Sequence, residues 1–290
     1  MSFEDVMGAM MRWSTATEAL AALGAELTLQ QSDAAAPPEI VAALRAVSSA
    51  AGLADLDELP PPQQAMVVSM IRMFLRQATD VLEHPDRPPG WTFTDPVILD
   101  GWGRGSAMVP MLLASSHPDL AEITSFLDVG TGVGLLAVAA ASMWPTATVV
   151  GIDPWEASLE RAQANVAAAG LGDRVTLREQ DLAALDDTDE FDCVWIPTFF
   201  LTEADLEKGL SAAMRALRPG GWVALGRMRP MPDPVAEATA GLRTIRAGGC
   251  TIETERAIEL LENAGCVEVH AAPPVGPAPL ELVLGRRPAS

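Results

Sequence analysis

The residues whose types and spacing best suit ligand chemistry are an aspartate and three glycines. Asp128 precedes Gly130, Gly132 and Gly134 in the segment Leu-Asp-Val-Gly-Thr-Gly-Val-Gly. Glycine has no Cβ, so it tolerates a positive φ and lets a ligand lie against main-chain N–H groups. A short apolar run precedes the glycines, and an Ala- and Leu-rich run follows them. This order predicts a strand, a glycine turn and a helix, with which an α/β sheet presents its backbone to a ligand.

The glycine spacing separates two kinds of ligand. A dinucleotide fingerprint has the spacing Gly-x-Gly-x-x-Gly and holds a pyrophosphate at the helix N-terminus. Here the spacing is Gly-x-Gly-x-Gly, and the Asp128 carboxylate would repel a pyrophosphate but can hold a cation. The segment resembles the first motif of class I S-adenosylmethionine-dependent methyltransferases. In that family the acidic residue and the glycine turn, which here includes Thr131, surround the amino-acid portion and the sulfonium of the cofactor.

A second acidic residue extends the resemblance. Asp153 follows a β-branched run over residues 147–152 and precedes Pro154 and Trp155. A carboxylate at the tip of the second strand can accept hydrogen bonds from both ribose hydroxyls. Asp153 is also suited to cap the helix expected over residues 155–167. The two roles are compatible; we favour ribose binding, and we expect Trp155 to flank the adenine.

Later segments match the family in the same order. After the third expected strand, the Asp181 side chain could accept a hydrogen bond from the adenine amino group, with Leu182 against the ring. A Leu-Arg-Pro-Gly-Gly turn at residues 217–221 precedes the fifth expected strand, as in the family. The resemblance thereby adds five residues to the cofactor site: Gln180, Asp181, Leu182, Ile196 and Pro197.

The segment Gly-Trp-Gly-Arg-Gly-Ser at residues 101–106 is an unusual opening for the apolar helix expected over residues 107–114. In class I methyltransferases the segment before the first strand often folds over the cofactor and supplies groups for its carboxylate. A guanidinium suits a carboxylate because it offers paired donors. We expect Arg104 and Ser106 to bind the cofactor; the alternative is a glycine-rich N-cap with a surface arginine.

The order of the expected elements predicts an α/β fold preceded by helices. For residues 91–290 the resemblance implies a Rossmann-like, seven-stranded, mostly parallel sheet flanked by helices. Residues 1–90 match no module that we can name, and we interpret them as an N-terminal helical cap or substrate lid, with helices over residues 3–30, 39–53 and 63–82. Residues 227–250 form an insertion that contains a helix, which we expect on the substrate side.

The composition limits the partners and the compartment. The 290 residues include 39 acidic and 19 basic side chains, a net charge of −20, which disfavours nucleic acid. The apolar runs are too short to cross a membrane, and the first 20 residues lack the basic start of a secretory signal. Three cysteines without metal-ligand spacing predict no disulfide and no metal site. We expect a cytoplasmic protein with a small-molecule substrate, and a homodimer is compatible with the sequence.

Candidate contacts to the methyl acceptor follow the fourth strand and lie in the insertion. Thr198, Phe199 and Phe200 occupy the usual substrate-side edge. Family members that methylate amino groups of nucleic acid or protein carry Asn/Asp-Pro-Pro-aromatic there, whereas this chain has Ile-Pro-Thr-Phe, which weakens an adenine, cytosine or glutamine acceptor. Arg243 and Arg246 lie three residues apart on the expected helix. They form either a clamp for a substrate carboxylate or a solvated pair.

No catalytic residue is assigned, because a displacement at a sulfonium needs positioning and does not require a base. His84, between cap and sheet, is the one weak candidate for a base. His117 and His270 are interpreted as structural or solvated. Several aromatic residues predict an apolar pocket: Trp91, Trp102, Trp195, Phe199 and Phe200.

The sequence therefore predicts an S-adenosylmethionine-dependent methyltransferase that methylates oxygen, nitrogen or carbon of a small, largely apolar metabolite, in specialised metabolism. A second hypothesis keeps the cofactor without methyl transfer, as a protein that catalyses another reaction or only binds. A third, a nicotinamide-dependent oxidoreductase, is disfavoured by the glycine spacing and by Asp128.

Overall fold

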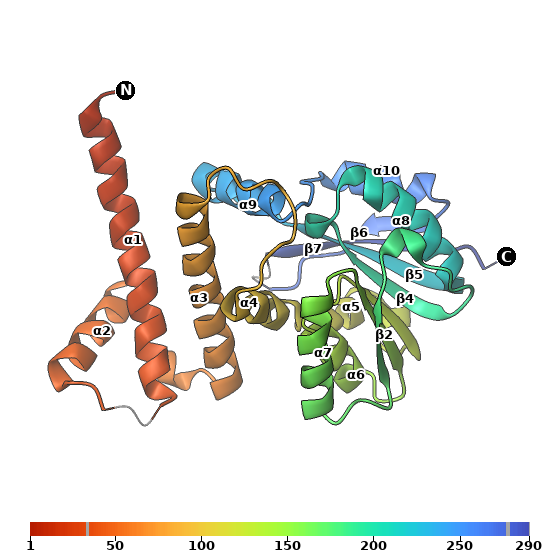
Figure 1. Ribbon diagram of the computed structural model, residues 1–290, viewed down its shortest axis with the longest axis horizontal. Coiled ribbons are helices and arrows are strands. Elements are labelled where there is room, and N and C mark those ends of the chain that lie inside the picture. The colour runs from red at the N-terminus through yellow and green to blue at the C-terminus, as the bar shows by residue number, and fades with distance from the viewer. Residues whose placement is uncertain (33–34, 277–278, 290) are drawn as a thin grey trace. The chain divides into compact units, whose positions relative to one another are not determined.

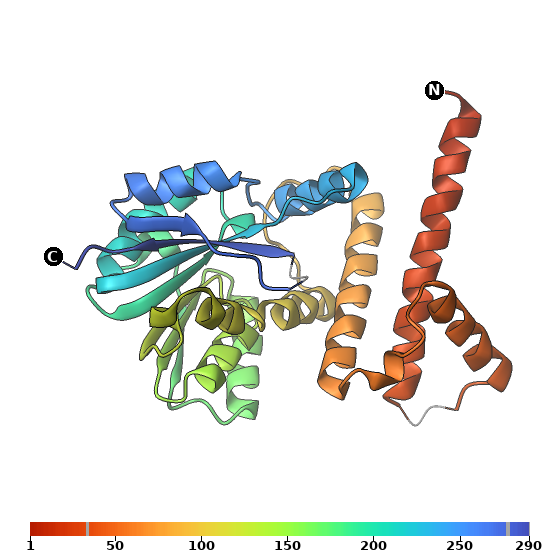
Figure 2. The same cartoon turned by 180° about the vertical axis from the view of Figure 1, so that it is seen from behind.

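The computed structural model describes residues 1–32, 35–276 and 279–289, and the chain divides into two compact units. The helical unit comprises Met1–Pro85 and Asp95–Gly105, and the sheet unit comprises Asp86–Thr94 and Ser106–Ser290. Figures 1 and 2 show their elements from two sides. Among the described residues, no helix combines the length and the apolar character that crossing a membrane requires.

The helical unit is built from α-helices and one short 3-10 helix. Its elements are α1 (Phe3–Gln30), α2 (Pro38–Ala50), η1 (Leu56–Glu58), α3 (Pro61–Glu83) and most of α4 (Pro96–Ser106). Ser2 and Asp5 form a capping box at the start of α1, and prolines open α2 and α3, where no N–H donor is needed. The three helices expected from periodicity are confirmed, although α2 ends three residues early.

The glycine-rich segment at residues 101–106 is helical, so the alternative interpretation as a glycine-rich N-cap was wrong. These residues form the second half of α4. A Cβ placed on Gly101 would lie 2.5 Å from the Cβ of Met73 on α3. Glycine is needed there because it lets α4 approach α3 closely, which outweighs its low helix propensity.

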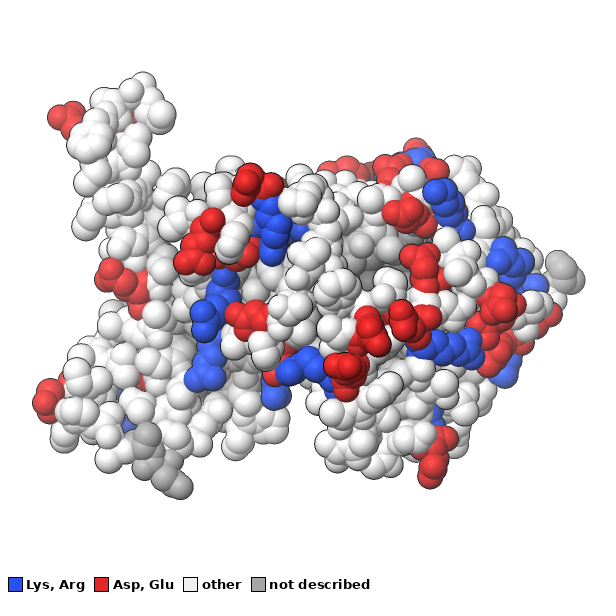
Figure 3. All heavy atoms as spheres, viewed as in Figure 1, with Lys and Arg blue, Asp and Glu red and all other residues white. Residues whose placement is uncertain are grey.

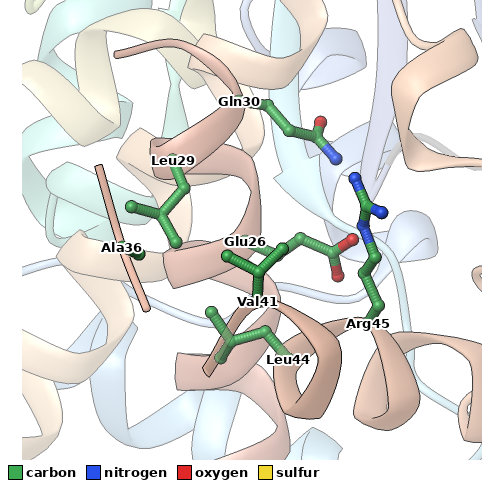
Figure 4. A pocket seen from close by; sticks show the side chains of 7 residues that line it. All are labelled: Glu26, Leu29, Gln30, Ala36, Val41, Leu44 and Arg45. Carbon is green, nitrogen blue, oxygen red and sulfur yellow. The ribbon is translucent and has the colours of Figure 1, made fainter. Parts of the chain in front are cut away.

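A small pocket lies between α1 and α2 of the helical unit (Figure 4). The Glu26 carboxylate is buried and accepts a hydrogen bond from the Ser48 hydroxyl at 2.5 Å. Figure 4 shows Glu26 and Arg45 pointing toward each other above an apolar floor that includes Leu44. Because its buried carboxylate is already hydrogen-bonded, we interpret this pocket as part of the packing of the two helices.

The sheet unit contains one seven-stranded sheet in the order β3-β2-β1-β4-β5-β7-β6, in which β7 alone runs antiparallel to its two neighbours. Its strands are β1 (Ser125–Val129), β2 (Thr148–Asp153), β3 (Val175–Glu179), β4 (Phe191–Pro197), β5 (Leu217–Met228), β6 (Val267–Ala271) and β7 (Leu280–Arg286). Its helices are α5 (Val109–Ser116), α6 (Leu135–Met143), α7 (Glu156–Ala168), α8 (Glu203–Ala216), α9 (Pro234–Arg246) and α10 (Thr254–Asn263), with 3-10 helices η2 (Pro118–Leu120), η3 (Leu182–Ala184) and η4 (Thr198–Phe200). The predicted fold class is confirmed.

The central strands β1 and β4 are buried on both faces of the sheet, which explains their continuous apolar runs. Phe126 belongs to the hydrophobic cluster on one face and the next residue, Leu127, to the cluster on the other. The same alternation holds for Cys193 and Val194 in β4. A strand buried on both sides cannot alternate between apolar and polar residues.

The expected turn at residues 217–221 lies inside β5 and is not a separate reversal. Leu217 pairs with Phe191, whereas Trp222 pairs with Cys193, so the register shifts between the two pairs. Gly220 takes a positive φ of 82° within this irregular start. The glycines therefore absorb an irregularity at the strand entrance, a role that the sequence motif does not distinguish from a turn.

Candidate active site

The carboxyl ends of β2, β1 and β4 form the edge that gathers most of the predicted cofactor residues. β1 pairs in parallel with β2 on one side and with β4 on the other. The chain therefore leaves β1 at the point where the strand order reverses. Ligands of open α/β sheets bind outside the carboxyl ends of the strands at such a point.

The turn after β1 is held in a left-handed backbone by its glycines. Gly130, Gly132 and Gly134 have φ values of 66°, 55° and 73°. The backbone N–H of Thr131 donates to the carbonyl of Ile152 at 3.0 Å, which ties the turn to β2. A Cβ on Gly134 would lie 2.9 Å from the Cβ of Ala162, whereas a Cβ on Gly132 would meet only a backbone oxygen at 3.9 Å. Of these two glycines, Gly132 therefore has more open space at its Cβ position.

Asp128 is a buried carboxyl group at the end of β1. It is 1% exposed, and its Oδ2 accepts a hydrogen bond from the Thr131 hydroxyl at 2.7 Å. Its Oδ1 is buried and has no hydrogen-bond partner among the described residues. Burial raises the pKa of Asp128 to about 7, and the nearby charge of Asp153 acts in the same direction.

Asp153 is the second buried carboxyl group of this edge, and both of its oxygens accept backbone N–H groups. Oδ2 accepts from Gly132 and Oδ1 from Trp155, each at 2.8 Å. Burial raises its pKa, and these two N–H donors act in the opposite direction. Asp153 joins the glycine turn to the start of α7, although Trp155 and not Asp153 occupies the N-cap position.

Three features of this edge fit S-adenosylmethionine. The unpartnered Oδ1 of Asp128 suits a cationic group. The left-handed glycines keep Cβ atoms away from a ligand that lies on the turn. The second lone pairs of the Asp153 oxygens can accept ribose hydroxyls.

The other predicted cofactor residues of the sheet unit lie around this edge. The backbone N–H of Gln180 donates to the carbonyl of Asp153 at 3.2 Å, and Asp181 is exposed beside it. Leu182 is buried and contacts α8, where a Cβ on Gly209 would lie 2.4 Å from its Cδ2. Pro154 and Trp155 follow β2, and Ile196 and Pro197 end β4. All of these assignments stay predictions.

A series of aromatic rings begins just after β4. Phe199 contacts Phe200 with a centroid distance of 4.7 Å, Phe200 contacts Trp91 at 4.9 Å, and Trp91 contacts Phe93 at 5.3 Å, all edge to face. Sequence reasoning named Trp91 only as a pocket aromatic, because residues 86–94 and 198–200 are distant in sequence and only the fold brings them together. Thr198 is buried and donates its hydroxyl to the carbonyl of Gly226 at 2.9 Å.

Two expectations for the acceptor side need correction. Trp195 was expected to line an apolar pocket, but it is 2% exposed in the core, where a Cβ on Gly226 would lie 1.9 Å from its ring. Arg243 and Arg246 are not a solvated pair. Arg246 is buried on α9, and burial lowers the pKa of the Arg243 guanidinium.

The helical unit and its junction hold the other candidates. Trp102 and Arg104 lie on α4, where Arg104 is exposed. His84 ends α3 and lies 3.3 Å from the Asp80 carboxylate. Ser106 is the last residue of α4 and belongs to the sheet unit. Their roles stay predictions.

Comparisons with known proteins agree with the fold and the glycine turn. A family profile described as "Methyltransferase domain" matches residues 126–221. Methyltransferase GfsG from Streptomyces halstedii is 30% identical over 206 residues, which cover 67% of this chain and 72% of that protein. Among solved structures, an O-methyltransferase family protein from Burkholderia thailandensis superposes with a TM-score of 0.72 at 18% identity, over 100% of this chain and 99% of that one. Human N-acetylserotonin methyltransferase in complex with S-adenosylmethionine gives 0.68 at 14% identity, over 98% of both chains.

The chain therefore belongs to the class I S-adenosylmethionine-dependent methyltransferases. It is an enzyme of this family and its cofactor is S-adenosylmethionine. This excludes the nicotinamide-dependent oxidoreductase, as the glycine spacing predicted.

Proposed function

We propose that this methyltransferase acts on a small, largely apolar metabolite and that its acceptor atom is a hydroxyl oxygen. The observation that carries the proposal is the aromatic series Phe199, Phe200 and Trp91, which starts two residues after Pro197. Pro197 packs against the glycine turn, because its Cγ would lie 3.5 Å from a Cβ on Gly130. A wall of rings beside the cofactor edge favours a flat apolar acceptor. The choice of oxygen is supported by the fold shared with an O-methyltransferase family protein.

The surface charge supports a small-molecule acceptor over a nucleic acid. The net charge is −20, and on the face in Figure 3 basic side chains form only short runs, most of them beside acidic side chains. A polyanionic acceptor would need a long basic stripe.

In this proposal the residues of the chain position the two reactants and exclude water. Bound S-adenosylmethionine supplies an electrophilic methyl group on a cationic sulfur. Asp153 would orient the ribose, and Asp128 would hold the cationic amino-acid portion. The glycine turn would keep the cofactor against the backbone, while the aromatic series would hold the acceptor in line with the methyl group.

Arg243 and Arg246 favour a second feature of the acceptor, a carboxylate. Both lie on α9, within residues 227–250, and both are at least half-buried. A guanidinium offers paired donors that suit a carboxylate. An acidic acceptor would then show a higher KM in Arg243→Gln.

A screen with mass-spectrometric detection tests the proposed function. The enzyme is incubated with S-adenosylmethionine and separate panels of phenols, enols and amines, with transfer RNA and a glutamine peptide as further arms. We expect S-adenosylhomocysteine to form together with a methylated hydroxy compound. Product formation in the RNA or peptide arm only would overturn the proposal.

We also propose that residues 1–90 act as a lid over the acceptor. In this segment, His84 is the candidate for a base. Hydrogen exchange of residues 61–83 with and without S-adenosylhomocysteine tests this. Slower exchange with the ligand is expected, and unchanged exchange would contradict it.

We further propose a homodimer formed through the first half of α1. Gly24 and Leu27, in the second half of α1, contact α3, and Glu26 contacts Ser48 of α2. The first half of α1 extends beyond α3 in both ribbon views. Five of its large apolar side chains are 47–78% exposed: Phe3, Val6, Met10, Met11 and Trp13. At 100° per residue they fall within an arc of about 160°, which excludes Glu4, Asp5 and Arg12. Figure 3 draws this end of the helix almost entirely in white.

The size and charge of this face suit a second copy of the chain. The exposed side chains offer on the order of 500 Å² per copy, so a symmetric pair reaches the roughly 1,000 Å² of a specific interface. A membrane surface is disfavoured because Arg12 is the only basic residue on this segment of an acidic chain.

A further inference from the structure

The two buried carboxyl groups of the cofactor edge differ in their hydrogen bonds. Asp153 accepts two backbone N–H groups, one on each oxygen, and N–H donors stabilise a carboxylate. Asp128 accepts one hydroxyl, from Thr131, on Oδ2 only. Its Oδ1 is buried without a hydrogen-bond partner in the described part of the chain. The environment therefore favours a negative charge on Asp153 more than on Asp128.

Among the described residues, the groups that act on Asp128 include no compensating cation. From β2, the charge that acts on it is that of Asp153, which is repulsive. From β4, Trp195 lies beside it in register. From α6, the backbone N–H of Ala137 favours the charged form, but it is a single dipole. Two negative charges on one buried edge are unfavourable until a cation joins them.

We propose that Asp128 is the proton-exchanging group of the cofactor site: it carries a proton on Oδ1 in the free enzyme and releases that proton to solvent when S-adenosylmethionine binds. The proton belongs on Oδ1 because Oδ2 already accepts the Thr131 hydroxyl. After release, the carboxylate faces the cationic amino-acid portion of the cofactor. This inference rests on the proposed assignment of Asp128 to that portion.

The expected effect is a pH-dependent affinity. Burial holds the pKa of Asp128 at about 7 in the free enzyme. If only the carboxylate binds the cation, affinity at pH 6 is about tenfold weaker than at pH 8. Binding at pH 6 then releases about 0.9 proton, and binding at pH 8 about 0.1 proton.

Isothermal titration calorimetry in pairs of buffers with different ionisation enthalpies measures both quantities. S-adenosylmethionine is titrated into the wild type and into Asp128→Asn at pH 6, 7 and 8. Because the cofactor's own amino group titrates equally with both proteins, the difference between them isolates Asp128. We expect the tenfold change in the wild type and a Kd in Asp128→Asn that follows the cofactor's titration alone.

A second variant and a direct probe keep the inference testable if Asp128→Asn does not bind. Thr131→Val keeps the carboxyl group but removes its donor, so the midpoint of the affinity change should move to higher pH. Infrared difference spectra of the wild type at pH 6 should lose a protonated-carboxyl band when S-adenosylmethionine is added. Binding at pH 6 without proton release or band loss would overturn this inference alone. Absence of binding at every pH would overturn the proposed cofactor site with it.

Discussion

At the scale of single residues, Gly132 shows how backbone conformation and ligand access coincide. Its φ is 55°, and a Cβ placed on it would have its nearest neighbour at 3.9 Å. A side chain at this position is therefore strained by φ and not by packing, and it would project into the open side of the turn.

Gly132→Val should abolish S-adenosylmethionine binding and cost about 1–3 kcal/mol of stability. The matched control is Gly172→Val, because Gly172 has no positive φ and no heavy atom within 4 Å of a Cβ. Calorimetry and thermal melting measure the two effects. Retained affinity in Gly132→Val would show that the cofactor does not lie on this turn.

Asp128 should also make the stability of the free enzyme depend on pH. Its pKa is about 7 in the folded state, against an ordinary value of 3.8 for an aspartate, so the folded state binds more protons than the unfolded state between these values. The free energy of unfolding therefore falls as pH rises from about 4 to about 7. Each unit of pKa difference corresponds to about 1.36 kcal/mol, so the free energy of unfolding falls by as much as about 4 kcal/mol over this range.

Asp128→Asn should remove that part of the pH dependence and gain stability relative to the wild type at pH 8. Chemical denaturation of the cofactor-free proteins at pH 4.5 and pH 8 measures it, with the exposed Asp173→Asn as control. Parallel pH profiles for wild type and Asp128→Asn would contradict the buried, protonated state of this group.

At the scale of elements, the turn after α9 positions the aromatic series Phe199, Phe200 and Trp91. A Cβ on Gly249 would lie 2.1 Å from the carbonyl oxygen of Phe199, and one on Gly248 would lie 3.0 Å from the Cα of Gly90. The Gly90 N–H also donates to the carbonyl of Arg246 at 3.2 Å. Two glycines thus let residues 86–94 and η4 meet at the end of α9.

Gly249→Ala should displace η4 and raise the KM for the acceptor several-fold, while the Kd for S-adenosylmethionine stays within about twofold. The control Gly241→Ala changes a glycine inside α9 whose Cβ meets nothing within 4 Å, and it should gain about 0.5–1 kcal/mol of stability. Steady-state kinetics and calorimetry separate the two constants. An unchanged KM in Gly249→Ala would contradict the assignment of η4 to the acceptor site.

The sequence was informative where local pattern decides the structure. Apolar and β-branched runs located β1 and β2, and the three glycines located the turn that joins β1 to α6. It was misleading at Gly101 and at Gly220, because a glycine that permits close packing or a bulge looks like a glycine that makes a turn. The contact between Trp91 and Phe200 depends on tertiary folding, and no local pattern encodes it.

At the scale of the whole molecule, the proposed dimer predicts a definite mass. The wild type should sediment at twice 30.5 kDa. Met10→Glu combined with Trp13→Glu should shift it to the monomer, because charges would enter an apolar interface. Met143→Glu, on an exposed methionine of the sheet unit, is the control. A wild type that stays monomeric, or a double variant that stays dimeric, would contradict the interface.

The most direct test of the account is calorimetry of S-adenosylmethionine with the wild type and with Asp153→Ala, using the exposed Asp173→Ala as control. Loss of the charge-assisted hydrogen bonds to the ribose should cost about 1.5–3 kcal/mol, roughly a 10- to 150-fold increase in Kd, and the control should bind like the wild type. An unchanged Kd in Asp153→Ala would contradict the placement of the cofactor across the ends of β1 and β2.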